Sequence, residues 1–231
     1  MAACLAAALP SSAILVRTDR DDAEYLELAS RYDTAVSLGT AGGEGVLIGS
    51  RWVLTTAERA KALQAMSPAP RLRFGKDQYA MQSTFVPPQL TPGGACDVGL
   101  ILLGKGVTGV RATPLYRQGD EAGKGVVIVG HGASGKIGAK ELARDGQTRA
   151  AINTVDRVEP RTVGLRLKKG DEASDLQGAI APDETGAPAY VETAAGLFVA
   201  GIAIGAGDEW QDYARVSACL AWIDGVILDT E

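Results

Sequence analysis

The stretch GEGVLIGSRWVLTTAERA (43–60) decides the fold class of this 231-residue chain. Its apolar runs at 45–50 and 52–57 are rich in strand-forming residues and are bounded by glycine, which is typical of short β-strands. The segment ERAKALQAM (58–66) has helical composition and stops before Pro68. These residues predict two neighbouring strands followed by a short helix.

Short strand-like runs of the same kind fill most of the remaining chain, with Gly, Pro, Asp and Asn between them as turns require. Further helical patterns are confined to the charged stretch 17–28 and to 214–228, where Val216, Leu220 and Ile223 form one apolar stripe. Because strands do not alternate with long helices, we predict an all-β barrel or sandwich with a C-terminal helix rather than a parallel α/β sheet.

The composition excludes several classes of function. Hydrophobic residues make up 46% and charged residues 22%, which is typical of a globular protein and excludes wholesale disorder. The net charge is −5 and there is no basic stripe, so we expect neither nucleic acid nor an anionic membrane as a partner. Since the chain has one histidine and no C-x-x-C pair, we also expect no metal and no cofactor.

The beginning of the chain indicates export. Residues 2–9 (AACLAAAL) form a short apolar run, and Ser11, Ser12 and Ala13 follow it. This pattern resembles the last part of a secretory signal peptide with a cleavage site after Ala13. We therefore expect residues 1–13 to be a signal-peptide remnant and the protein to be secreted or periplasmic.

Three segments, in order, resemble the three catalytic segments of trypsin-like serine proteases of the bacterial type. The opening stretch looks like the family's apolar strand and W-V-L-T-A-A-H motif, with Glu58 in place of the histidine. The segment CDVGLILL (96–103) is similar to D-I-A-L-L-x-L and retains the aspartate as Asp97. The segment PDETGAPAYV (182–191) is similar to G-D-S-G-G-P and has Thr185 at the position of the nucleophilic serine.

Two further segments, VIVGHG (127–132) and YARVSACLAWI (213–223), resemble the family's V-x-G-W-G and Y-x-R-V-x-x-x-x-x-W-I, so the resemblance runs from about 30 to 223. It implies a trypsin-like domain at 14–231 built from two antiparallel six-stranded β-barrels. The expected parts are an N-terminal barrel at about 30–108, a crossover at about 109–122, a C-terminal barrel at about 123–213 and a C-terminal helix at about 214–228.

The resemblance also implies that the catalytic machinery is degenerate. In the family a histidine takes the hydroxyl proton, an aspartate orients that histidine, and backbone N–H groups hold the oxyanion. The carboxylate of Glu58 lacks the two ring nitrogens of an imidazole, and the methyl group of Thr185 crowds its hydroxyl. Asp183 and Thr185 stand at the oxyanion-hole positions, where an acidic side chain would oppose an oxyanion. We therefore expect Glu58, Asp97 and Thr185 to occupy triad positions without catalysing proteolysis.

The family pattern assigns roles to two more groups of residues. Ala179, Ile204 and Ala206 correspond to the specificity pocket, which would be apolar and uncharged. Cys96 and Cys219 are expected to lie close together and to form a disulfide, with two buried free thiols as the alternative.

One segment carries a competing pattern. GVVIVGHGASGK (125–136) contains a G-x-G-x-x-G dinucleotide-binding pattern and a G-x-x-x-x-G-K phosphate-loop pattern. Nucleotide binding through 130–136 is therefore a minor alternative, against which the glycines that follow break up any crossover helix. His131 lies in this segment, at a turn that the family places far from the cleft, and we interpret it as a polar turn residue.

The leading prediction is a proteolytically inactive trypsin-like homologue, monomeric, that binds a protein or peptide through the old cleft or through surface loops. The rival from a different class is an active peptide or ester hydrolase that uses Thr185 with Glu58 and Asp97.

Overall fold

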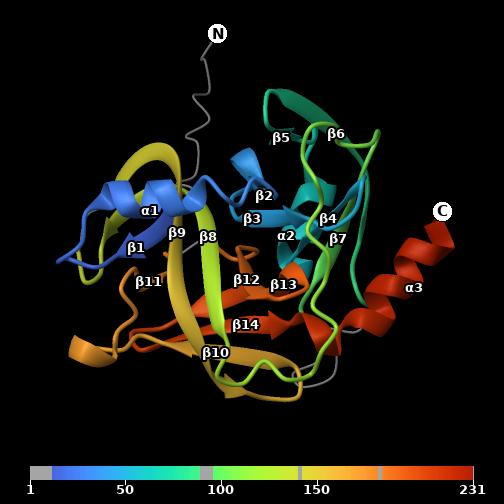
Figure 1. Cartoon of the computed structure of the whole chain (residues 1–231). Helices are drawn as coiled ribbons and strands as arrows, with labels where there is room; N and C mark the ends of the chain where they lie inside the picture. Colours follow the sequence, from blue (N-terminus) through green and yellow to red (C-terminus); the bar gives the residue numbers. More distant parts are fainter. Residues whose placement is uncertain (1–11, 89–95, 140–141, 182–183, 231) are drawn as a thin grey trace, which may run out of the picture.

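The structure is a computed structural model that describes residues 12–88, 96–139, 142–181 and 184–230. Two β-barrels pack against each other, and the chain ends in a helix that extends to one side of them (Figure 1). Within the described ranges no helix is both long enough and apolar enough to span a membrane.

The first barrel is one antiparallel sheet built from the residues that open the sequence argument. In spatial order it contains β2 (Ala35–Ser37), β3 (Glu44–Leu47), β4 (Trp52–Thr55), β7 (Gly99–Leu103), β6 (Asp77–Phe85) and β5 (Arg71–Phe74). Leu47 and Val53 face the interior of this barrel, whereas Val46 and Leu54 belong to the core shared with the second barrel. Both faces of β3 and β4 are therefore buried, which explains their continuous apolar runs.

The second barrel contains β8 (Gly125–Lys136), β12 (Pro188–Thr193), β13 (Gly196–Ala206), β14 (Trp210–Arg215), β10 (Thr162–Arg166) and β9 (Ala143–Val158) in spatial order. Pairing of β8 with β9 closes this six-stranded ring. Two short strands extend its sheet: β1 (Ser12–Val16) runs parallel to β8 and antiparallel to β11 (Gly178–Ala179).

Two of the three predicted helices begin later than the sequence suggests. The charged stretch 17–28 contributes only α1 (Asp22–Ala29), because Asp21 and Glu24 form a capping box that fixes its start. Helix α2 (Ala57–Ala65) matches its predicted range closely. The predicted C-terminal helix starts too early, since residues 214 and 215 end β14 and a 3-10 turn at 216–218 precedes α3 (Leu220–Thr230). Two more 3-10 turns lie at Gly39–Ala41 and Gly170–Glu172.

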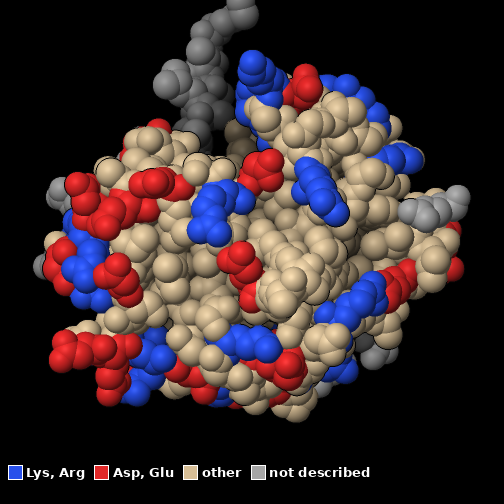
Figure 2. Space-filling view, in the orientation of Figure 1, with Lys and Arg blue, Asp and Glu red and all other residues tan. Residues whose placement is uncertain are grey.

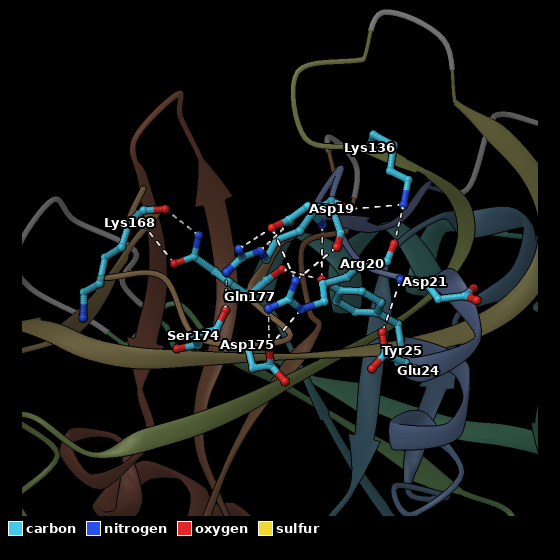
Figure 3. Close-up of polar contacts among 11 residues, drawn as sticks. Asp19, Arg20, Asp21, Glu24, Tyr25, Lys136, Lys168, Ser174, Asp175 and Gln177 are labelled. Carbon is cyan, nitrogen blue, oxygen red and sulfur yellow. Dashed lines mark hydrogen bonds and ion pairs between the residues drawn. The ribbon is translucent and has the colours of Figure 1, made fainter. Parts of the chain in front are cut away.

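A network of polar contacts holds the segment between β1 and α1 against the second barrel (Figure 3). Lys136 donates to the backbone carbonyl of Arg20 at 2.9 Å, and the Arg20 guanidinium pairs with Asp175 at 2.6 Å. The hydroxyl of Tyr25 donates to the carbonyl of Gln177 at 3.0 Å. These contacts fix β1 beside β11, the strand that contains Ala179.

Residues 125–136, which carry the glycine-rich nucleotide patterns, form the single continuous strand β8. A dinucleotide fingerprint requires a loop between a strand and a helix whose N-terminus meets the phosphates. In the described part of the chain β8 is followed by the antiparallel strand β9 and not by a helix. The structural context that nucleotide binding needs is missing, so this minor alternative is wrong.

Candidate functional site

The start of α2 lies beside the segment that contains Thr185 and carries the residue predicted at the histidine position. The Thr56 hydroxyl caps this helix by accepting from the backbone N–H of Arg59 at 3.3 Å. The cap places Glu58 and Arg59 in the first helical turn. Glu58 is exposed, whereas Arg59 is partly buried.

Arg59, and not Glu58, contacts the predicted nucleophile. The Nε of Arg59 donates to the Oγ1 of Thr185 at 2.7 Å, and the same guanidinium donates to the carbonyl of Ala41 at 3.4 Å. Among the described residues no hydrogen bond joins Glu58 to Thr185. Because a guanidinium has only donors, it cannot accept the proton of the threonine hydroxyl.

Asp97 lies next to the start of α2 and is about half-buried. Burial raises the pKa of the Asp97 carboxyl group, and the negative charge of Glu58 raises it further. A hydrogen bond from the backbone N–H of Ala57 to this carboxyl group lowers the pKa and offsets part of the effect. Asp97 therefore supports the first turn of α2. The residue before it, Cys96, is joined by a disulfide to Cys219, and their Cα atoms are 5.5 Å apart.

A cluster of buried acids lies directly beside position 185. Glu184 is buried, and its Oε2 accepts from the backbone N–H of Ala181 at 2.7 Å, while its Oε1 has no hydrogen-bond partner in the described structure. Burial raises the pKa of the Glu184 carboxyl group well above its usual range, and the nearby charge of Glu44 acts in the same direction. Glu44 itself is fully buried, and burial raises its pKa against the opposing effect of His131.

His131 provides the partner that Glu44 needs. Its backbone N–H and its Nδ1 lie 3.1 Å and 2.7 Å from the two carboxylate oxygens of Glu44. Burial lowers the pKa of the imidazole, but the carboxylate of Glu44 outweighs burial, so the pKa is raised overall. The interpretation of His131 as a remote turn residue is wrong, because it lies within β8 and reaches β3 of the other barrel.

Backbone contacts hold the segment around Thr185 between the two barrels. The N–H of Glu44 donates to the carbonyl of Thr185 at 3.0 Å, and the N–H of Gly186 donates to the carbonyl of Ala203 at 2.8 Å. Gly186 has a φ of +97°, and a Cβ at this position would overlap the carbonyl oxygen of Glu44. Only glycine fits here without strain.

The remaining predicted positions lie around the second barrel. Ala179 is buried in β11, where it pairs with Leu15 of β1. Ile204 is half-buried and Ala206 is exposed, both in β13. Asp183, the predicted oxyanion-hole position, lies outside the described residues. The roles assigned to these side chains stay predictions.

Sequence reasoning missed the pairing of Glu44 with His131. One signal was present, because Glu44 is a charged residue between two glycines at the head of an otherwise apolar strand. A charge at such a position needs a buried partner.

In the described part of the chain no group of three or more His, Cys, Asp or Glu side chains is arranged to hold a metal ion.

Comparisons with known proteins identify the fold. No family model matches the sequence, and no curated protein matches it. Among solved structures the chain is similar to neuropsin, a serine protease expressed in the limbic system of mouse brain, with a TM-score of 0.64 and 15% sequence identity over 86% of this chain and 96% of that chain. The chain therefore has the double-barrel fold of chymotrypsin-like serine proteases, as predicted, with two six-stranded barrels and a C-terminal helix.

Proposed function

We propose that this protein is a proteolytically inactive relative of trypsin-like proteases that acts outside the cytoplasm by binding a protein or peptide. The observation that carries the proposal is the 2.7 Å contact between Arg59 Nε and Thr185 Oγ1. Catalysis of acyl transfer needs a base that removes the hydroxyl proton. A donor-only group stands at that place instead.

The supporting groups of a triad are also separated from Thr185. Asp97 accepts from the amide of Ala57 and has no imidazole to orient among the described residues. The one histidine, His131, is engaged with Glu44. The rival hydrolase built from Glu58, Asp97 and Thr185 would need Glu58 to replace Arg59 at the hydroxyl.

Export is part of the same proposal. The disulfide between Cys96 and Cys219 supports it, because such bonds form and persist in oxidising compartments. The partner would bind to surface loops of the two barrels or to the surface around Arg59 and Thr185.

Labelling with a fluorescent fluorophosphonate, together with hydrolysis of a peptide-substrate mixture between pH 6 and pH 9, tests the inactivity. We expect no label on the wild-type protein or on the Thr185→Val variant, which keeps the side-chain shape and removes the hydroxyl. Arg59→Gln is the matched variant that removes the blocking cation. Label or turnover in the wild type that disappears in Thr185→Val would establish the hydrolase instead.

A further inference from the structure

A groove with a volume of about 630 Å³ lies beside the first barrel. Its lining residues come from α1, β2 and the β5–β6 hairpin, and from β8 and β9 of the second barrel. Residues from each of these elements line it, among them Leu26, Val36, Arg73 and Thr148. Glu58, Asp97 and Thr185 do not line it.

The two strands that border the groove are the end strands of the first sheet. Among the strands of the described residues, β2 pairs with β3 alone and β5 pairs with β6 alone. The backbone hydrogen bonds of the described residues include none between β2 and β5. Because Cα atoms of β2 and β5 lie within 8 Å of each other, there is no room for a further strand between them, and an occupant would be held by the side chains that line the groove.

The β5 wall is basic. Arg71 and Arg73 are exposed, whereas Leu72 and Phe74 between and after them are buried. Because side chains alternate along a strand, both arginines project from the same side, about 7 Å apart. Neither has a carboxylate at ion-pair distance in the described structure, unlike many other arginines of this chain. Figure 2 shows Lys and Arg side chains gathered over this hairpin.

The opposite walls are almost uncharged. Asp33 is the only carboxylate among the residues that line the groove, and α1 contributes Leu26, Ala29 and Ser30. The acidic side chains of α1 visible in Figure 2 lie outside this lining. The groove thus offers two cations at one wall and apolar or small polar side chains at the other.

We infer that this groove binds an extended acidic segment of a partner protein, with carboxylates at alternate positions facing Arg71 and Arg73. The spacing of alternate residues in an extended chain equals that of the two arginines, so one carboxylate can pair with each. The inference deepens the proposed binding function and rests on it. His131 lines the groove and also holds Glu44, so an occupant lies directly over the contact that supports position 185.

Fluorescence anisotropy with a labelled ten-residue peptide of alternating Glu and Thr tests this inference. We expect this peptide to bind the full chain at low salt, and the Gln–Thr analogue to bind at least tenfold more weakly. Arg71→Gln combined with Arg73→Gln should weaken binding of the acidic peptide at least tenfold. The matched control is Arg111→Gln with Lys169→Gln, which removes the same charge from exposed side chains outside the groove and should change binding less than twofold.

Three outcomes would overturn the inference: no binding of the acidic peptide, equal binding of the Glu and Gln peptides, or equal losses in the groove and control variants. Stronger binding of a single-stranded oligonucleotide of equal charge would assign the groove to a polyanion instead. The fluorophosphonate experiment is independent of all these results. Fluorophosphonate labelling at Thr185 would contradict the proposed inactivity. If instead the acidic peptide does not bind through Arg71 and Arg73, only the proposal of this docking site is contradicted.

Discussion

The Nδ1 of His131 lies 2.7 Å from the carboxylate of Glu44 and joins β8 of the second barrel to β3 of the first. Glu44 in turn donates its backbone N–H to the carbonyl of Thr185. One side-chain pair and one backbone contact thus connect both barrels to position 185. The backbone at Thr185 is therefore tied to a buried acid that needs its partner.

Removing the imidazole should destabilise the protein strongly. His131→Leu leaves the fully buried carboxylate of Glu44 without its main partner, which should lower the free energy of unfolding at pH 7 by about 3 kcal/mol. Adding Glu44→Gln removes the charge and should recover part of the loss. Urea unfolding of the two single variants and the double variant measures this, and strictly additive losses would contradict a direct interaction.

Glu184 should make stability fall with rising pH. Its pKa is raised in the folded state, so the folded protein keeps a proton that the unfolded chain releases above pH of about 4.3. The stabilisation is complete below that pH and is lost as the pH rises toward the folded-state pKa, by about 1.4 kcal/mol per pH unit. Urea unfolding between pH 4.5 and pH 5.5, below the ordinary imidazole pKa of about 6.5, should show a smaller slope for Glu184→Gln. The exposed Glu172→Gln is the control, and an unchanged slope in Glu184→Gln would contradict the assignment.

A side chain at position 186 should not be tolerated. Gly186→Ala combines a positive φ with an overlap between the new Cβ and the carbonyl oxygen of Glu44. We expect a loss of at least about 3 kcal/mol in the free energy of unfolding. Gly123→Ala, which also has a positive φ but open space around it, should cost about 1 kcal/mol in thermal or urea unfolding. Equal losses in the two variants would show that the contact with Glu44 contributes nothing.

The disulfide should contribute substantially to stability. Cys96 and Cys219 are separated by 123 residues, and on the chain-entropy model a loop of this size adds about 4 to 5 kcal/mol. The variant Cys96→Ala with Cys219→Ala should lose about this amount in urea unfolding. Alkylation and mass spectrometry of the denatured protein from an exporting host give the redox state, and two alkylated thiols there would rule out the bond.

The fold was predictable because its main signals are local. Glycine-bounded apolar runs such as 45–50 and 52–57 became β3 and β4, and the helix after them ended before Pro68 as its composition indicated. Gly130 shows where local signals fail. It belongs to a loop-like pattern in the sequence, yet it lies inside β8, where a Cβ would collide with the carboxylate of Glu184. The sequence cannot distinguish a glycine that forms a turn from one that makes room for a distant side chain.

The contacts of the candidate site were not predictable from the sequence. Matching motifs named Glu58, Asp97 and Thr185 as triad positions, but they did not indicate which side chain would contact the threonine hydroxyl. The cap formed by Thr56 and the helical turn after it bring Arg59 to that hydroxyl, while Glu58 is left exposed. Which of these two adjacent residues faces Thr185 depends on how α2 is rotated about its axis. The spacing of the sequence motifs does not define that rotation.

The position of β1 has a consequence for how the molecule can be divided. This strand comes before the whole first barrel in the chain, yet it pairs with β8 of the second. A cut in the crossover would not separate two self-sufficient halves, because the later fragment would lack a strand that only the earlier one carries. The start of the chain thus belongs structurally to the second barrel. If the two fragments were mixed, β1 of the earlier fragment would have to pair with β8 of the later fragment as an intermolecular contact.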